Sequence, residues 1–170
     1  MDNLSLSQGF TAALNSGALA NGTNAGTVKT TATINFVLDG QFYSKAATDN
    51  LSIAYTGPTV YQAPTGVGSV NGGFTGGSNG STRLYLLCLN SSGTLSVVPG
   101  RIVDSAELTA GRAALEFPDT QVTGICPIGA LRIAVTAGTT FVPGTTSLAA
   151  AGVTASYYNL ADVPSNPLTA

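Results

Sequence analysis

VKTTATINFVLDGQFYSK, residues 28–45, carries the clearest structural signal in the chain. Its core-type residues share one parity, namely Val28, Ala32, Ile34, Phe36 and Leu38. Apolar residues at every second position are typical of a strand with one dry face and one wet face. Asp39-Gly40 follows, and this dipeptide favours the positive φ angles of a type I′ turn. The stretch therefore predicts a β-hairpin in which residues 41–45 return beside residues 28–39.

Further strand signals follow along the chain, at residues 51–55, 83–89, 95–98, 101–103, 128–136 and 153–160. The run at 83–89 is almost continuously apolar, which is typical of a strand buried on both faces. Residues 106–115 are the best helix candidate, but Gly111 interrupts them, so we expect at most one short helix. Short strands separated by turns predict a mainly β fold, a single antiparallel β-sandwich or barrel of jelly-roll-like or β-tulip-like type.

Composition divides the chain into an arm, a domain and a tail. Residues 1–27 mix small and polar residues with a few apolar ones, and we expect an extended N-terminal arm that orders against the body or a neighbouring chain. Residues 28–163 form the β domain, and residues 164–170 form a Pro-containing C-terminal tail. Within the domain, the Gly-rich stretch 63–82 predicts a long surface loop with Phe74 at its centre.

The surface is expected to be polar but nearly uncharged. Hydrophobic residues make up 44% of the chain and charged residues only 8%, whereas soluble domains usually carry about 25% charged residues. Ser, Thr, Asn, Gln and Gly must therefore cover the exterior. Such a surface suits close packing against other proteins, because few charges lose their hydration when it is buried.

Charge and hydropathy exclude two classes of partner. The net charge is −2, the sequence pI is about 4.7, and the six basic residues are scattered, so we expect no nucleic acid as a partner. No apolar stretch approaches the roughly 18 residues of a membrane-spanning helix, so we expect no membrane partner. Residues 1–8 lack the basic and apolar regions of a signal peptide, which predicts synthesis in the cytosol if the chain is complete as given.

The residues needed for catalysis are missing or scattered. The chain has no histidine, which removes the commonest general base. Cys88 and Cys126 lie in apolar surroundings, which favours two buried reduced thiols over a disulfide and gives no zinc cluster. Glu116 and Asp119 are close in sequence, but a solvated loop explains them better than a shared site. We therefore predict no catalytic residue, no cofactor and no metal, and hence no enzyme.

A few apolar and aromatic residues are the candidates for partner contact. In the arm and the Gly-rich loop they are Leu4, Leu6, Phe10, Leu14 and Phe74. Tyr157 and Tyr158 complete the set, because tyrosine is favoured at protein interfaces. Tyrosine also prefers strands in general, so half-buried strand residues are the alternative explanation for this pair.

The order of three segments resembles the small head decoration proteins of tailed bacteriophages, also called cement or capsid-stabilising proteins. The segments are NFVLDGQFYSKAATDN at 35–50, RLYLLCLNSSGTLSVVPGRIVD at 83–104 and LEFPDTQVTGICPIGALRIAVTAGTTFVPGTT at 115–146. The resemblance runs from about Thr30 to Leu168. It implies a virion structural protein, made in the host cytoplasm, that sits as a homotrimer on the outer surface of the capsid. Such proteins stabilise the shell by bridging neighbouring major capsid subunits, and residues 1–27 would grip it.

Two other functions stay open. The chain could be the receptor- or glycan-binding head of a viral fibre or spike, with the tyrosines and the Gly-rich loop as its recognition surface. It could also be a hydrolase that uses Glu116 and Asp119 as a carboxylate pair.

Overall fold

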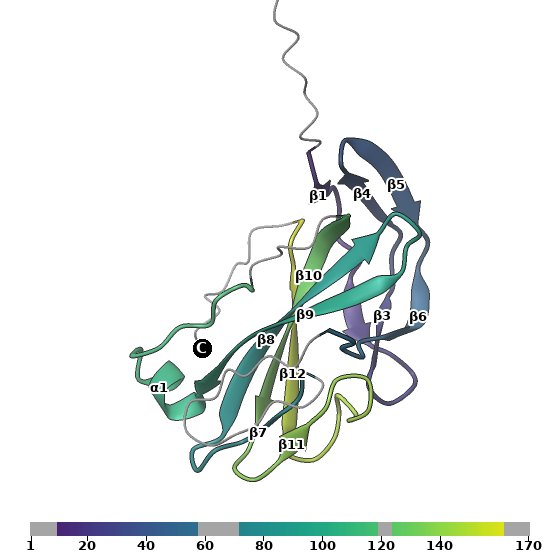
Figure 1. Cartoon of the computed structure of the whole chain (residues 1–170). Coiled ribbons are helices and arrows are strands. Elements are labelled where there is room, and N and C mark those ends of the chain that lie inside the picture. Colours follow the sequence, from purple (N-terminus) through teal and green to yellow (C-terminus); the bar gives the residue numbers. More distant parts are fainter. Residues whose placement is uncertain (1–9, 58–71, 119–123, 162–170) are drawn as a thin grey trace, which may run out of the picture.

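The computed structural model describes residues 10–57, 72–118 and 124–161 (Figure 1). These ranges form several antiparallel sheets and one short helix, so the mainly β, sandwich-like fold predicted from the sequence is confirmed. The sheets of the described ranges do not close into a barrel.

The main sheet has four antiparallel strands in the order β12-β10-β8-β9. Their bounds are Val153–Asn159 for β12, Ile125–Val135 for β10, Ser81–Asn90 for β8 and Leu95–Asp104 for β9. Strand β8 lies between two neighbours, and all its residues except Asn90 are buried. This matches the prediction from its continuous apolar run.

Both faces of β8 are packed. Tyr85, Leu87 and Leu89 point into the main hydrophobic core. Successive strand residues point to opposite faces, so Leu84 and Cys88 face the other side of the sheet, where they too are fully buried.

A second sheet, called here the outer sheet, has the order β1-β4-β5. Its strands are Ala12–Ala13 (β1), Ile34–Leu38 (β4) and Gln41–Lys45 (β5). Asp39 has φ 52° and Gly40 has φ 79°, and Leu38 pairs directly with Gln41, so the two-residue type I′ turn is confirmed. In Figure 1 the outer sheet lies at the end of the main sheet opposite α1 and β7.

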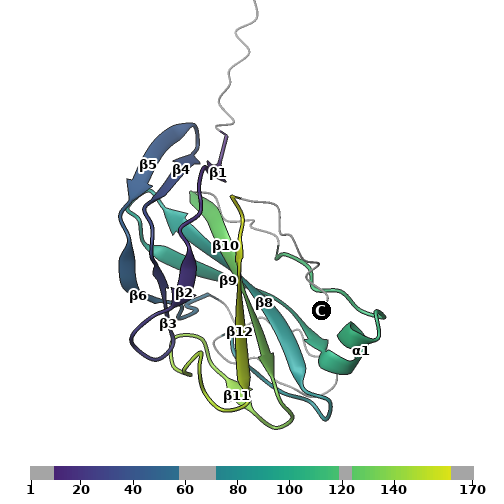
Figure 2. The same ribbon diagram turned by 180° about the vertical axis from the view of Figure 1, so that it is seen from behind.

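A third sheet has the order β2-β3-β6, with bounds Leu19–Asn21, Thr27–Thr30 and Thr48–Ser52. The single strand predicted over 28–39 is thus divided, because Thr31 N–H bonds to the Gly17 and Ala18 carbonyls and the chain passes from one sheet to the next. Strand β6 begins at Thr48, shortly after β5 ends at Lys45. Figure 2 shows β2 beside β12 at the back of the molecule, where Tyr157 donates a hydrogen bond to Asn21.

Residues 10–27 of the expected arm are ordered against the body of the domain. Strand β1 pairs with β4, and β2 pairs with β3, so this part of the arm extends two sheets of the β domain. Strands of two and three residues leave no periodicity in the sequence, and only their long-range partners define them. Residues 1–9 and the predicted tail at 164–170 lie outside the described ranges.

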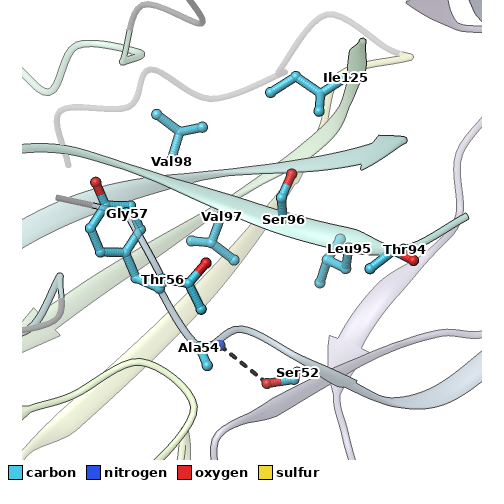
Figure 3. A pocket seen from close by; sticks show the side chains of 11 residues that line it. Ser52, Ala54, Thr56, Gly57, Thr94, Leu95, Ser96, Val97, Val98 and Ile125 are labelled. Carbon is cyan, nitrogen blue, oxygen red and sulfur yellow. Dashed lines mark hydrogen bonds between the residues drawn. The ribbon is translucent and has the colours of Figure 1, made fainter. Parts of the chain in front are cut away.

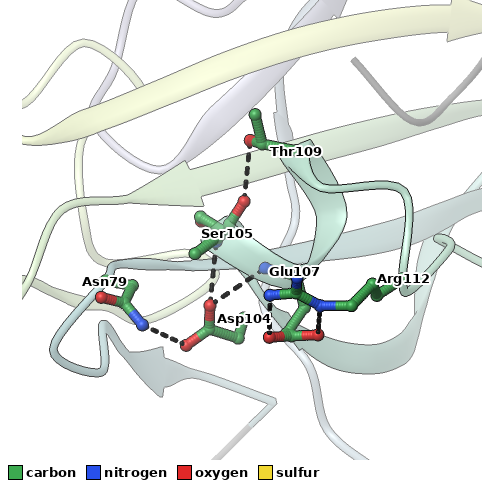
Figure 4. A network of polar contacts seen from close by, with 7 residues as sticks. Asn79, Asp104, Ser105, Glu107, Thr109 and Arg112 are labelled. Carbon is green, nitrogen blue, oxygen red and sulfur yellow. Dashed lines mark hydrogen bonds and ion pairs between the residues drawn. The ribbon is translucent and has the colours of Figure 1, made fainter.

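A short pair of strands and a helix complete the fold. Strand β7 (Phe74–Thr75) pairs with β11 (Thr140–Phe141). Helix α1 (Ser105–Thr109) begins at the N-cap Asp104, whose carboxylate accepts the Ala106 and Glu107 N–H groups (Figure 4). The one short helix expected from the sequence is confirmed, and it ends at Thr109 because the chain takes a left-handed turn at Gly111, φ 68°.

Candidate interaction surface

Exposed apolar side chains gather on the outer sheet. Among the described residues the exposed large hydrophobic side chains are Phe10, Leu14, Phe42 and Phe117. The first three belong to β5 or to the residues that flank β1, and Phe117 lies after α1.

The strand register places these side chains on one face. Val37 pairs with Ala12 on one side and with Phe42 on the other, so the three form a row across the sheet. Phe36 and Leu38 alternate with Val37 and are buried in the core, so the row points outward.

Phe10 and Leu14 flank Ala12 along the edge of the sheet. Each lies two residues from Ala12 and therefore has its parity. Backbone hydrogen bonds hold both in place, from Gly40 N–H to the Phe10 carbonyl at 3.1 Å and from Leu14 N–H to the Asn35 carbonyl at 2.8 Å. We call the outward face formed by Phe10, Ala12, Leu14, Val37 and Phe42 the apolar patch.

The patch is strongly exposed. Phe10 is 65% exposed, Phe42 64% and Leu14 50%. Single exposed apolar residues are ordinary, but several on the same face of one small sheet indicate an interaction site.

The structure places the predicted contact residues in different environments. Phe10 and Leu14 come together in the patch, and Phe42, which the sequence analysis missed, joins them. Leu4 and Leu6 lie outside the described residues. Phe74 is a wrong prediction, because it is only 1% exposed and its ring packs against Phe141, with centroids 6.2 Å apart.

Tyr157 and Tyr158 lie on β12 of the main sheet and do not contribute to the patch. Both are partly buried. Tyr157 packs against the hydrophobic core, and its burial raises the pKa of its phenol to about 12. The alternative explanation, half-buried strand tyrosines, therefore describes how they lie.

A groove of about 560 Å³ runs between β9 and the segment that follows β6 (Figure 3). Its walls carry aliphatic and hydroxyl side chains, including Leu95, Ser96, Val98 and Thr56, together with Tyr55. In Figure 3 Ser96 and Val98 point to one side of β9, and Leu95 and Val97 point to the other. Among the residues that the structure describes, no charged side chain lines the groove, so these walls suit an uncharged ligand.

Arg83 was predicted only as one of the scattered basic residues, yet it is fully buried. Its Nε donates to the Gly100 carbonyl at 2.7 Å, and its Nη1 donates to the Gly72 carbonyl at 3.0 Å. Tyr85 Oη donates to the same Gly72 carbonyl at 2.7 Å. Burial lowers the pKa of Arg83 and raises that of Tyr85. The pair anchors the chain at residues 72–73 to the main sheet.

Within the described ranges, no group of three or more Cys, Asp or Glu residues could hold a metal ion. Glu107 forms an ion pair with Arg112, at 2.8 Å, which lowers the pKa of its carboxyl (Figure 4). Glu116 is exposed, whereas Asp119 lies outside the described residues. The hypothesis that these two carboxylates form a pair is therefore not tested.

The two cysteines are reduced and buried. Cys126 pairs with Leu89, while Cys88 pairs with Pro127, so the two thiols point to opposite faces of the main sheet. This arrangement excludes a disulfide without rearrangement of the backbone. The reduced state favoured by the sequence is therefore what the structure shows.

Both thiols are expected to resist alkylation in the native protein. Burial raises the pKa of Cys88 to about 12 and that of Cys126 to about 11, so the reactive thiolate is scarce at neutral and mildly alkaline pH. Mass spectrometry after iodoacetamide treatment at pH 8 should show unmodified protein, and both sites should react in denaturant. Rapid labelling of either thiol in the folded protein would contradict the burial.

No helix within the described ranges has the length and apolar character that a bilayer crossing requires. Comparison with known protein families, curated proteins and solved structures finds no match.

Proposed function

We propose that this protein is a virion structural protein that decorates the outside of a phage capsid and stabilises the shell by bridging neighbouring major capsid subunits. The apolar patch is the observation that carries the proposal, since it offers a rigid, exposed contact face. The order of the three sequence segments and the nearly uncharged composition support it.

The physics of such binding depends on contact area and on repetition. A patch centred on two phenylalanines and a leucine supplies hydrophobic contact without the cost of burying charges. A shell repeats its binding position many times, so each contact can be modest while the sum resists internal pressure. Linking several such contacts raises the overall affinity by orders of magnitude.

Binding to purified phage shells tests the proposal. The protein is expected to co-sediment with expanded shells and not with immature ones. Phe42→Ser should weaken shell binding about tenfold or more, since truncation of a central aromatic hot-spot residue typically costs about 2 kcal/mol or more and a tenfold loss corresponds to about 1.4 kcal/mol. Phe117→Ser is the matched control, because Phe117 is also exposed but lies away from the patch. Equal loss in both variants, or no binding by the parent protein, would refute the proposal.

The second candidate is a receptor- or glycan-binding head, and the groove beside β9 is the observation that favours it. Tyr55 and the hydroxyls of Thr56, Thr94 and Ser96 could contact an uncharged sugar. Binding of a neutral oligosaccharide that Tyr55→Ala abolishes and Phe42→Ser leaves intact would favour this function over decoration.

A further inference from the structure

Strand β5 is an open edge of the outer sheet. Within the described ranges β4 is its only paired neighbour, and Gln41, Phe42 and Ser44 are exposed. Natural edges are usually protected by proline, by lysine or by a bulge. Strand β5 contains no proline, its one lysine, Lys45, stands at its last position, and the pairing of β4 with β5 shows no register shift.

The type I′ turn decides which backbone groups face this open edge. The turn closes with a hydrogen bond between Leu38 and Gln41, and hydrogen-bonded pairs alternate along an antiparallel ladder. Gln41, Tyr43 and Lys45 therefore use their backbone groups for β4. Phe42 and Ser44 direct their N–H and C=O groups outward, where a further strand could pair with them.

A second copy of β5 satisfies these groups. If two β5 strands run antiparallel with Tyr43 opposite Tyr43, each Phe42 faces the Ser44 of the other copy. Each such pair exchanges both of its N–H···O bonds. Centring the pairing on Phe42 would instead require Gly40, whose N–H already donates to the Phe10 carbonyl. The Tyr43-centred register thus uses all the outward groups of the strand.

The charges of the hairpin are self-complementary in this register. Asp39 and Lys45 are the only charged residues between Lys29 and Asp49, and they lie at opposite ends of β5. Antiparallel pairing brings the Lys45 end of each copy to the Asp39 end of the other. The two-fold symmetry makes this favourable contact twice and places no like charges together.

We propose that two copies of this protein associate through β5, which joins their outer sheets into one continuous six-stranded sheet. Paired residues on neighbouring strands point to the same side. The two apolar patches therefore form one larger apolar face. This two-fold dimer differs from the trimer that the resemblance implies.

The mass of the free protein in solution tests the pairing. Analytical ultracentrifugation over a wide concentration range should show a species of about twice the 16.9 kDa chain. Ser44→Pro removes one outward N–H from each copy and should raise the dissociation constant about tenfold or more, while Ser44→Ala should leave it unchanged. Lys45→Glu places like charges together and should also weaken the dimer, more strongly at low salt.

Cross-linking tests the register. In the proposed dimer the two Tyr43 Cα atoms form a non-hydrogen-bonded pair about 4.5 Å apart, within the range of a disulfide. Tyr43→Cys should form a covalent dimer when diamide oxidises the two thiols and is itself reduced to the hydrazine. Ser44→Cys should not, since its two copies lie about 7–8 Å apart on the diagonal. Cys88 and Cys126 are buried and give no background.

A monomer or a trimer in solution, or cross-linking through Ser44→Cys in place of Tyr43→Cys, would overturn the pairing. Circular dichroism of each variant shows whether it is folded. Because these measurements use the free protein, they are independent of shell binding. The dimer proposal can therefore be refuted while the capsid-binding proposal stands, and the reverse also holds.

Discussion

Replacing Arg83 by methionine is expected to lower the free energy of unfolding by about 3–5 kcal/mol. The guanidinium donates hydrogen bonds to the carbonyls of Gly72, Gly73 and Gly100, at 3.0, 3.4 and 2.7 Å. Methionine fills much of the same volume but donates nothing, so the Gly73 and Gly100 carbonyls lose this donor, while the Gly72 carbonyl keeps the Tyr85 hydroxyl. Each unsatisfied buried group costs about 1–3 kcal/mol. Urea denaturation followed by circular dichroism measures the change.

Arg101→Met is the matched control for this experiment. Arg101 lies on β9 and its side chain is exposed, so its replacement should change stability by no more than about 0.5 kcal/mol. Arg83→Lys should fall between the parent and Arg83→Met, because a lysine keeps the charge but lacks the planar fork that reaches separate carbonyls. Similar stabilities for Arg83→Met and Arg101→Met would show that the buried guanidinium is not an anchor.

Phe74→Ala is expected to destabilise the protein by about 3–5 kcal/mol, the usual cost of removing a buried phenylalanine ring. The ring is 1% exposed, packs against Phe141 and belongs to the main hydrophobic core. Its removal leaves a cavity beneath the β7–β11 pair. Thermal and urea denaturation of the variant measure the loss.

Comparison of Phe74→Ala with Phe117→Ala shows whether Phe74 is a core residue or a surface contact. Phe117, which is 42% exposed, serves as the control, and Phe117→Ala should have little effect on unfolding. Had Phe74 been the exposed centre of a mobile loop, the two variants would behave alike. Matching stabilities would therefore restore the surface interpretation of Phe74.

Local sequence signals explain why the hairpin and the main sheet could be predicted. The alternation around Phe36 and the Asp39-Gly40 turn specify β4 and β5 without reference to the rest of the chain. The long apolar run of β8 does the same for the centre of the main sheet. The outward position of Phe42 opposite Val37 also follows from that hairpin register, so these two of the five patch residues could have been placed from the sequence.

Long-range pairing explains what the sequence could not show. Strands β1 and β7 have two residues each, and their partners β4 and β11 are distant in the chain. The glycines around Phe74 indicated a loop, because nothing local reports that Phe141 covers its ring. The burial of Arg83 could not be predicted either, since arginine is normally exposed and its carbonyl partners come from two distant segments, at Gly72-Gly73 and at Gly100.

The strand order of the main sheet has a consequence for synthesis on the ribosome. Strand β8 can pair with β9 as soon as both emerge, because a short turn joins them, but its other neighbour, β10, begins only at Ile125. A nascent chain therefore carries a highly apolar strand with one open edge while residues 105–124 are translated. Slow codons in that interval would prolong the exposure, and chaperone binding there would protect it.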